Sequence, residues 1–181
     1  MIRQPLPVDP RSPIAIKRNV HEALIDAPAP RFAAALRALL VEPGARFGPI
    51  VLRREAARAG RPFSAGEYFR GCFALPFAFP GARWLEDNVL SDHAEIVELD
   101  ELSVTYRYLS GTPIAGESRL SVTPRGERAH FEAVFSFQEQ STAAILLLHL
   151  AAARLHDRVT AAQIERAAAR IDAPVLWSTL R

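Results

Sequence analysis

Two tyrosines, two positions apart, are the residues whose types and spacing most directly suggest chemistry. Tyr106 and Tyr108 follow Leu102 and Val104 in a segment where apolar and polar residues alternate. This alternation predicts a half-buried strand with both phenols on its inward face. A phenol there could polarise a ligand carbonyl, as a cyclase would require. Alternatively, each hydroxyl could reach a backbone carbonyl or the sheet rim, because a buried tyrosine needs a hydrogen-bond partner.

His93 is the third candidate for chemistry. It follows Asp92 and stands two residues before Glu95, which makes a compact group of acids and one imidazole. Such a group could supply the base that moves a proton during catalysis. The alternative is structural, since a cluster of this kind also suits a turn or a helix cap.

The remaining histidines and the single cysteine do not predict a metal or cofactor site. His149 and His156 are seven positions apart, whereas helical metal ligands usually stand three or four apart. Cys72 is the only cysteine, which excludes a disulfide or a thiolate cluster within one chain. Motifs for nucleotide binding and for serine hydrolases are also missing from the sequence. We therefore expect no metal and no cofactor.

These candidates need a sheet to hold them, and the sequence predicts further strands after the tyrosines. Ser118, Leu120 and Val122 alternate with polar residues, and a turn is expected at 124–126. In the next strand the inward face carries small and aromatic residues in turn, namely Ala129, Phe131, Ala133, Phe135 and Phe137. That face suits either a cavity wall or a tightly packed core. His130 is expected on the opposite, solvated face.

A long apolar helix should follow these strands. Residues 142–157 are rich in leucine and alanine and contain neither glycine nor proline. The apolar run from Ala143 ends at Arg154, which is too short for the ~20 residues of a membrane span. A capping-box pattern at Thr160 to Gln163 predicts the start of another helical stretch, which Asp172 and Pro174 would end.

The first half of the chain is less regular. It predicts a proline-rich arm at 1–13, a strand at 14–25, and a helix entered through Pro30 and ended at Pro43-Gly44. The helix is indicated by an apolar stripe of helical spacing, formed by Phe32, Leu36, Leu39 and Leu40. Further strands are expected at 46–55 and 67–75, and a loop or broken strand at 77–88. Residues 14–181 are expected to form one domain, because 181 residues with 49% hydrophobic and 23% charged composition suit one core.

Composition also bears on partners and location. The net charge is +2, and the basic residues are scattered along the chain instead of forming a run. Nucleic-acid binding is therefore not expected, since such binders usually cluster their positive charge. The N-terminal residues contain no apolar signal sequence, so a cytoplasmic location is expected.

The order of strand, helix, antiparallel strands and long C-terminal helix resembles the START/Bet v1-like superfamily, also called SRPBCC. The run from Tyr106 to Pro113, the triplet Gly116-Glu117-Ser118 and the aromatic strand 131–137 resemble a bacterial and plant branch of uncharacterised proteins. The resemblance implies an α+β helix-grip fold, in which an antiparallel sheet wraps around the C-terminal helix and leaves an internal cavity. In this superfamily such cavities bind lipids, hormones or polyketide intermediates, and sometimes catalyse cyclisation or dehydration.

Three functions remain open from the sequence. The first is binding of a hydrophobic, lipid-like or polyketide-like molecule by Phe69, Phe73, Tyr106, Tyr108, Phe131 and Phe135. The second is a cyclase, dehydratase or isomerase in the same cavity, with Tyr106 or Tyr108 polarising a carbonyl and a carboxylate or His93 moving a proton. The third is an interaction protein with a filled core, whose arm or apolar edge docks a partner or a second copy. A homodimer is compatible with all three.

Overall fold

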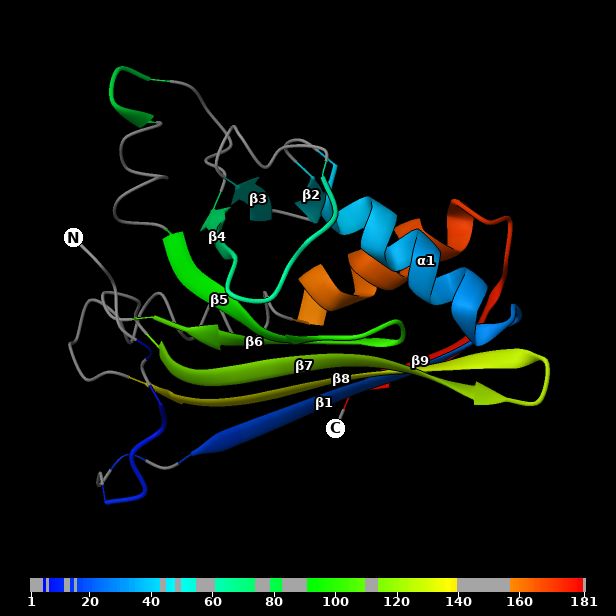
Figure 1. The fold of residues 1–181 in the computed structure, drawn as a ribbon, viewed down its shortest axis with the longest axis horizontal. Coiled ribbons are helices and arrows are strands. Elements are labelled where there is room, and N and C mark those ends of the chain that lie inside the picture. Colours follow the sequence, from blue (N-terminus) through cyan, green and yellow to red (C-terminus); the bar gives the residue numbers. More distant parts are fainter. Residues whose placement is uncertain are drawn as a thin grey trace.

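A curved antiparallel sheet of nine strands forms most of the structure (Figure 1). This computed structural model describes residues 5, 7–11, 14, 16–42, 45–47, 50–54, 61–73, 79–82, 91–109, 114–139 and 157–180. The strands are β1 (Lys17–Ile25), β2 (Arg46–Phe47), β3 (Ile50–Arg54), β4 (Tyr68–Phe73), β5 (Ser91–Leu99), β6 (Ser103–Tyr108), β7 (Ile114–Arg125), β8 (Arg128–Glu139) and β9 (Val175–Leu180). Their spatial order is β2-β3-β4-β5-β6-β7-β8-β1-β9, so that β2 and β9 form the two edges.

Two helical segments lie on the same side of the sheet (Figure 1). Helix α1 (Ala29–Leu40) begins with Pro30 in its first turn, where a fixed backbone angle and a missing N–H are tolerated. Its buried residues, including Phe32, Leu36 and Leu39, recur at helical spacing and face the sheet. Residues 157–169 form the second helical segment, and Ile164, which is fully buried, belongs to the same core as α1.

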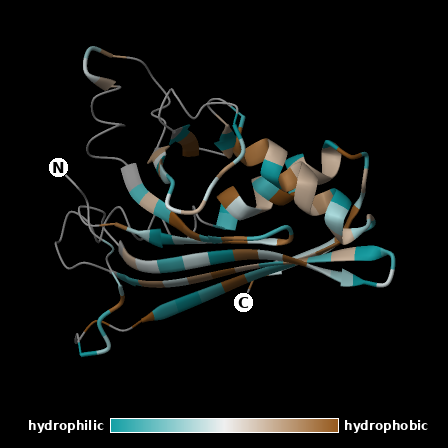
Figure 2. Ribbon diagram, viewed as in Figure 1, coloured by the Kyte–Doolittle hydropathy of each residue, from teal (hydrophilic) through white to brown (hydrophobic). Residues whose placement is uncertain are grey.

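The register of β7 and β8 explains where the core lies. Leu120 pairs with Ala133 and Val122 with Phe131, and all four side chains are buried on the inward face. The predicted alternation of both strands is thereby confirmed, and it is visible as alternating hydropathy along the long strands in Figure 2. Phe131 meets Phe32 of α1 edge to face, with ring centroids 6.1 Å apart. The aromatic face of β8 therefore packs against α1 as a solid core at this point.

Two local expectations from the sequence differ from the structure. The single strand expected at 46–55 is a pair of antiparallel strands, β2 and β3, with Phe47 opposite Ile50. The turn expected at 124–126 is displaced, because Pro124 and Arg125 still pair with β8 and Gly126 (φ +64°) begins the turn. Glycine favours that backbone angle at the first central position of a two-residue hairpin.

The C-terminal expectations need correction as well. Thr160 lies inside a helical segment that already includes residue 157, so the capping-box pattern at this position does not start a helix. The helix predicted at 142–157 lies outside the described residues except for residue 157, which is helical. After a turn at residues 170–172, the chain forms β9, which the sequence did not predict. Strand β9 pairs with β1 and extends the sheet by one strand.

His130 is buried, which contradicts its expected place on a solvated face. It does lie on the outward face of β8, but Trp177 of β9 packs beside it with ring centroids 6.0 Å apart. His130 Nε2 lies 3.4 Å from the Glu22 carboxylate on β1. On the same face, the buried Gln138 amide donates to the Asp9 carbonyl at 2.9 Å. Segments far away in the sequence therefore cover this face, which strand periodicity alone cannot show.

A second buried histidine connects three elements on the inward face. His21 Nε2 of β1 shares a hydrogen bond of 2.7 Å with Ser178 Oγ of β9, and Asp157 of the C-terminal helical segment is the nearby acid. Burial lowers the pKa of His21, and the negative charge of Asp157 opposes this change. Burial also raises the pKa of Asp157. Within the described residues, His21 Nδ1 and Asp157 Oδ1 have no hydrogen-bond partner, so the three residues do not form the continuous relay of a hydrolase triad.

Gly116 of β7 should tolerate no side chain. Its φ is +128°, and an added Cβ would lie 2.1 Å from the backbone oxygen of Ser136 on β8. Gly126 also has a positive φ, but a Cβ there would meet nothing within 4 Å. We expect Gly126→Ala to cost about 1 to 2 kcal/mol through backbone strain. Gly116→Ala should cost at least about 2 kcal/mol more, because strain and overlap add. Urea denaturation of both variants measures this difference, and equal losses would contradict the strand geometry.

His21 should make stability depend on pH. Because its pKa in the folded protein lies below the ordinary value of 6.5, the unfolded chain takes up a proton first as the pH falls below 6.5. Folding therefore loses free energy between that pH and the lowered pKa, by at most about 1.4 kcal/mol per pH unit. The variant His21→Gln lacks this titration. In urea denaturation, the free energy of unfolding of this variant relative to that of the wild type should therefore rise as the pH falls from 7.5 to 5.5. Parallel pH profiles would contradict the assignment.

Candidate functional site

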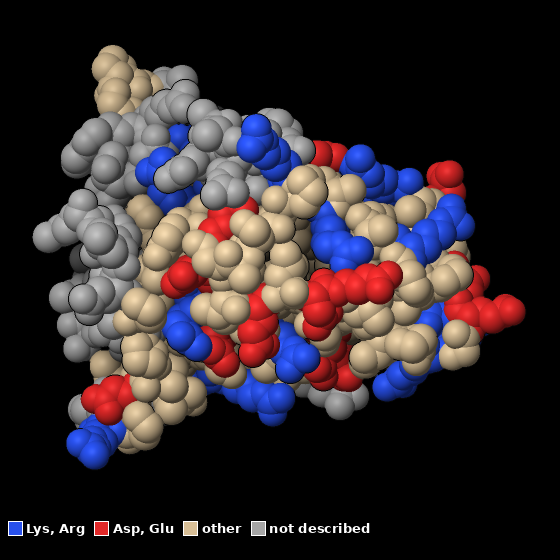
Figure 3. Space-filling model, viewed as in Figure 1, with Lys and Arg blue, Asp and Glu red and all other residues tan. Residues whose placement is uncertain are grey.

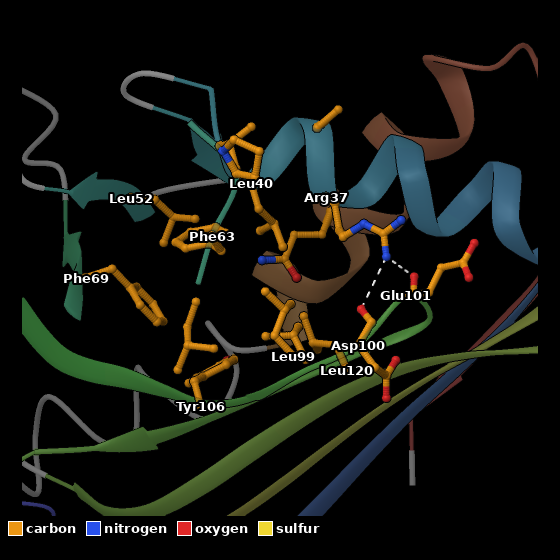
Figure 4. A pocket seen from close by; sticks show the side chains of 16 residues that line it. Arg37, Leu40, Leu52, Phe63, Phe69, Leu99, Asp100, Glu101, Tyr106 and Leu120 are labelled. Carbon is orange, nitrogen blue, oxygen red and sulfur yellow. Dashed lines mark hydrogen bonds between the residues drawn. The ribbon is translucent and has the colours of Figure 1, made fainter. Parts of the chain in front are cut away.

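A cavity of about 670 Å³ lies between α1 and the part of the sheet formed by β3 to β7 (Figure 4). Helix α1 covers β7 and β8 closely, whereas the neighbouring strands curve away from its C-terminal end (Figure 1). The lining is mostly apolar and comes from several elements: Arg37, Ala38, Leu40, Val41, Leu52, Pro62, Phe63, Phe69, Ile96, Leu99, Asp100, Glu101, Val104, Tyr106, Leu120 and Gln163. Its volume falls within the ~300 to 1,000 Å³ typical of small-molecule sites.

Arg37 joins α1 to the hairpin between β5 and β6 at one side of the cavity. Its guanidinium donates to the backbone carbonyls of Asp100, at 3.3 Å, and of Glu101 (Figure 4). The Asp100 carboxylate accepts hydrogen bonds from the backbone N–H groups of Leu102 and Ser103 and from the Ser103 hydroxyl. The bond from the Ser103 hydroxyl is the largest cause of the lowered pKa of Asp100. These polar groups therefore shape the hairpin beside the cavity.

The connection before β4 is tied to β5 and brings Phe63 to the cavity. Gly66 N–H donates to the Ile96 carbonyl at 2.7 Å, and Ile96 N–H donates to the Glu67 carbonyl at 2.9 Å. The buried Glu67 carboxylate also accepts a hydrogen bond from Ser64 N–H at 3.2 Å. This connection is thus held against the sheet by backbone hydrogen bonds, and Phe63 packs on Phe69 edge to face with centroids 5.9 Å apart.

Two of the predicted ligand-binding residues, Phe69 and Tyr106, line this cavity. Their rings are edge to face, 5.4 Å apart between centroids, and both project toward the space below α1 in Figure 4. Tyr106 also contacts Tyr108 at 5.9 Å, and Tyr108 contacts Phe135 at 5.7 Å. A continuous row of aromatic rings therefore leads from the cavity into a neighbouring core cluster.

The structure places the other predicted ligand-binding residues elsewhere. Tyr108 and Phe135 belong to the neighbouring cluster with Ala94 and Phe137, and they are not among the residues that line the cavity. Phe131 is fully buried beneath α1. Phe73 pairs through its backbone with Ile50 of β3, and its side chain lies outside the described part of the structure.

His93 lies on β5 but is not among the cavity-lining residues. Its neighbour Ala94 is buried in the inward-facing cluster, so alternation places the imidazole of His93 on the opposite face of the strand. Its backbone carbonyl accepts a hydrogen bond from Leu109 N–H at 2.9 Å. The structure therefore brings Tyr106 to the cavity and leaves His93 on the other side of the sheet.

Gln163 is the cavity residue that sequence reasoning missed most clearly. It was part of the capping-box pattern, yet it projects from the middle of the C-terminal helical segment and is 8% exposed. Its side-chain amide is one of the few polar groups in the lining. The available signal was helical spacing. Gln163 stands four residues after Val159 and directly before the apolar Ile164, which already placed it next to the core. Of the α1 residues in the lining, only Leu40 belonged to the apolar stripe predicted for this helix, and Arg37 and Ala38 did not.

The charged side chains on one face of the molecule do not single out another site. On the face shown in Figure 3, acidic and basic residues are interspersed, and neither sign covers a continuous area. None of the helices in the described part of the chain has the length and apolar character needed to cross a membrane.

The comparisons with known proteins identify a fold. No family model matches the chain, and no curated protein matches it in sequence. Among solved structures, the Zhui aromatase/cyclase from Streptomyces sp. R1128 is similar with a TM-score of 0.58 and 15% identity, over 87% of this chain and 96% of that one. Norcoclaurine synthase from Thalictrum flavum has a TM-score of 0.55 and 13% identity, over 93% and 98%. Ara h 8.0201 has a TM-score of 0.58 and 9% identity, over 86% and 99%.

These neighbours are Bet v1-like proteins, and their similarity extends over most of each chain. At such low identity it establishes architecture and not activity. The more specific resemblance to a bacterial and plant branch stays a prediction. The nine-stranded antiparallel sheet, the helices on one side of it and the neighbours together show that this chain has a Bet v1-like, helix-grip fold.

Proposed function

We propose that the cavity binds an uncharged, largely apolar small molecule that presents one hydrogen-bonding group to Gln163. The observation that carries this proposal is a cavity of about 670 Å³ whose lining is mostly apolar and includes the side chain of Gln163. An apolar lining favours an apolar ligand, and a few polar groups usually fix its orientation. The Gln163 amide can both donate and accept a hydrogen bond, so a ligand group that pairs with it would be held in one orientation.

The charges around the cavity argue against an ionised ligand group deep inside. The guanidinium of Arg37 is engaged by two backbone carbonyls, and the Asp100 carboxylate is engaged by its own hairpin. Glu101 is exposed. An ionised group carried into the apolar part of the cavity would therefore lose its hydration without meeting a free opposite charge among the described lining residues. A neutral lipid-like or polyketide-like molecule meets these conditions.

The structural neighbours are compatible with this proposal. One structure of the Thalictrum flavum norcoclaurine synthase, with a TM-score of 0.51, is a complex with dopamine and hydroxybenzaldehyde. The same fold thus accommodates small aromatic molecules in another protein. In this chain, the edge-to-face rings of Phe63, Phe69 and Tyr106 offer aromatic surface to such a ligand. The cavity also argues against the hypothesis of an interaction protein with a completely filled core.

Blocking the cavity should abolish binding without unfolding the protein. Ala38 of α1 lines the cavity, whereas Ala34, one turn earlier, is exposed on the same helix. We expect Ala38→Trp to reduce binding of a hydrophobic fluorescent probe at least about tenfold, which corresponds to ~1.4 kcal/mol. Ala34→Trp should leave binding unchanged. Probe titration, together with circular dichroism of both variants, measures this, and equal affinities would refute the cavity as the binding site.

Native mass spectrometry of the freshly purified protein identifies the ligand class directly. A co-purified neutral mass that is lost from the Ala38→Trp variant and kept by Ala34→Trp would support the proposal. Wild-type protein that carries no ligand and also fails to bind the probe would contradict it, and the cavity would then be only a packing defect.

Catalysis in the same cavity is the second candidate, and the position of Tyr106 favours it. The phenol-bearing ring lines the cavity wall and could donate a hydrogen bond to a ligand carbonyl, as a cyclase, dehydratase or isomerase would need. His93 does not line the cavity, so the proton acceptor would have to be a carboxylate at the hairpin or water. Tyr108 could act only through Tyr106, which it contacts.

A matched pair of tyrosine variants tests this second function on the co-purified compound or its carbonyl analogues. Tyr106→Phe should lower turnover at least about tenfold, because loss of a general acid or of an oxyanion donor typically costs about a hundredfold or more. Tyr68→Phe, at an exposed position on β4, should not change it. Ligand binding by Tyr106→Phe should persist. Unchanged turnover in Tyr106→Phe would remove this residue from any mechanism.

A further inference from the structure

The last strand of the sheet has an open edge that is unusually apolar. Strand β9 is at the end of the strand order, so one of its two sides pairs with β1 and no described strand pairs with the other. Its sequence, Val-Leu-Trp-Ser-Thr-Leu, contains no charge, proline or glycine. Leu176, Trp177 and Leu180 are 42%, 39% and 46% exposed, and they make up half of the large exposed hydrophobic residues in the described part of the chain. Edges of this kind are templates for pairing with another strand.

The opposite edge of the sheet lacks these properties. Strand β2 has only two residues, one of which is the exposed Arg46. The backbone carbonyl of Arg46 also accepts a hydrogen bond from the guanidinium of Arg166. Shortness, charge and an occupied carbonyl are common protections of an edge strand. Only one of the two edges is therefore suited to extending the sheet.

We propose that β9 pairs antiparallel with β9 of a second copy of this chain, which joins two sheets across a twofold axis. Because one edge is open and the other protected, the assembly closes as a dimer and does not grow into a filament. The partner is a second copy because the strand is complementary to itself. A neutral strand meets no like charge when it pairs with its own twin, whereas nothing on β9 would select a charged partner strand.

The geometry of the sheet also fixes the register of this pairing. A twofold axis perpendicular to the sheet keeps each side chain on its own face, so opposed residue numbers must have an even sum. The pairing with β1 places Trp177 and Thr179 on the outward face and Ser178 and Leu180 on the inward face. Centring the axis on Ser178 puts Ser178 opposite its twin and Trp177 opposite Thr179. This register uses the regular part of β9 at 177–179, because a bulge interrupts the alternation at Leu176. It opposes an aromatic with a β-branched residue, which favours cross-strand packing.

Two variants with equal exposure test the interface. Leu180 on β9 and Ile16, just before β1, are both 46% exposed in the single chain. We expect the wild type to be a dimer in sedimentation velocity and in size exclusion with light scattering. Leu180→Lys should be a monomer, or should weaken the dimer at least about tenfold, because a charge is then buried at the new contact. Ile16→Lys should remain a dimer, and circular dichroism should show all three proteins folded.

The register is tested by a single cysteine. Cys72, the only natural cysteine, is fully buried. In the Ser178→Cys variant, the new thiol is therefore the only one that an oxidant can reach. Mild oxidation should convert this variant to a disulfide-linked dimer, since directly opposed antiparallel residues bring the Cα atoms to about 4.5 to 5.5 Å. Thr179→Cys should cross-link less, because its twin is displaced along the strand.

Each outcome decides the proposal. A monomeric wild type at high protein concentration would overturn it and would leave β9 to a different partner. A dimer that survives Leu180→Lys, or that Ile16→Lys dissociates, would place the interface elsewhere and would also overturn it. A dimer that responds as expected but cross-links better through Thr179→Cys would overturn the register centred on Ser178. None of these results depends on ligand binding in the cavity.

Discussion

The packing of α1 against β7 and β8 is the contact on which the rest of the structure depends. Phe32 of α1 meets Phe131 of β8 edge to face, and the small residues Ala129 and Ala133 on the same face let the helix approach closely. Close contact at this place fixes the helix over one part of the sheet. The curved strands on the other side then diverge from its C-terminal end, and the space between them remains as the cavity. The cavity is therefore a consequence of how the core is packed.

Polar contacts of the backbone define the borders of that space. Arg37 holds α1 to the β5–β6 hairpin, whose turn is stabilised by the carboxylate of Asp100. Backbone hydrogen bonds between Ile96 and the 66–67 segment hold Phe63 on the opposite border. Because Arg37 and Asp100 are engaged in these contacts, the lining is for the most part apolar, and Gln163 and Tyr106 are among its polar members. This division explains why we propose a neutral ligand.

Strand β9 changes the character of one end of the molecule. It pairs with the edge of β1, and its Trp177 contributes to the burial of His130. Its Ser178 shares a hydrogen bond with His21. At the same time it moves the open edge of the sheet to an uncharged strand. The same six residues thus complete the core on one side and expose apolar surface on the other, which is the physical basis of the proposed dimer.

The sequence by itself determined the elements whose side chains repeat with a clear period. The alternation in β6, β7 and β8 predicted both their faces and the inward position of Tyr106, and the spacing around Phe32 predicted α1. Only the tertiary structure decided which inward residues line a cavity and which pack solidly, because strand periodicity assigns a face but not what lies opposite it. Phe131 meets α1, whereas Phe69 and Tyr106 meet open space. His130, Gln163 and β9 escaped prediction for the same reason, since their environments are made by segments distant in the sequence.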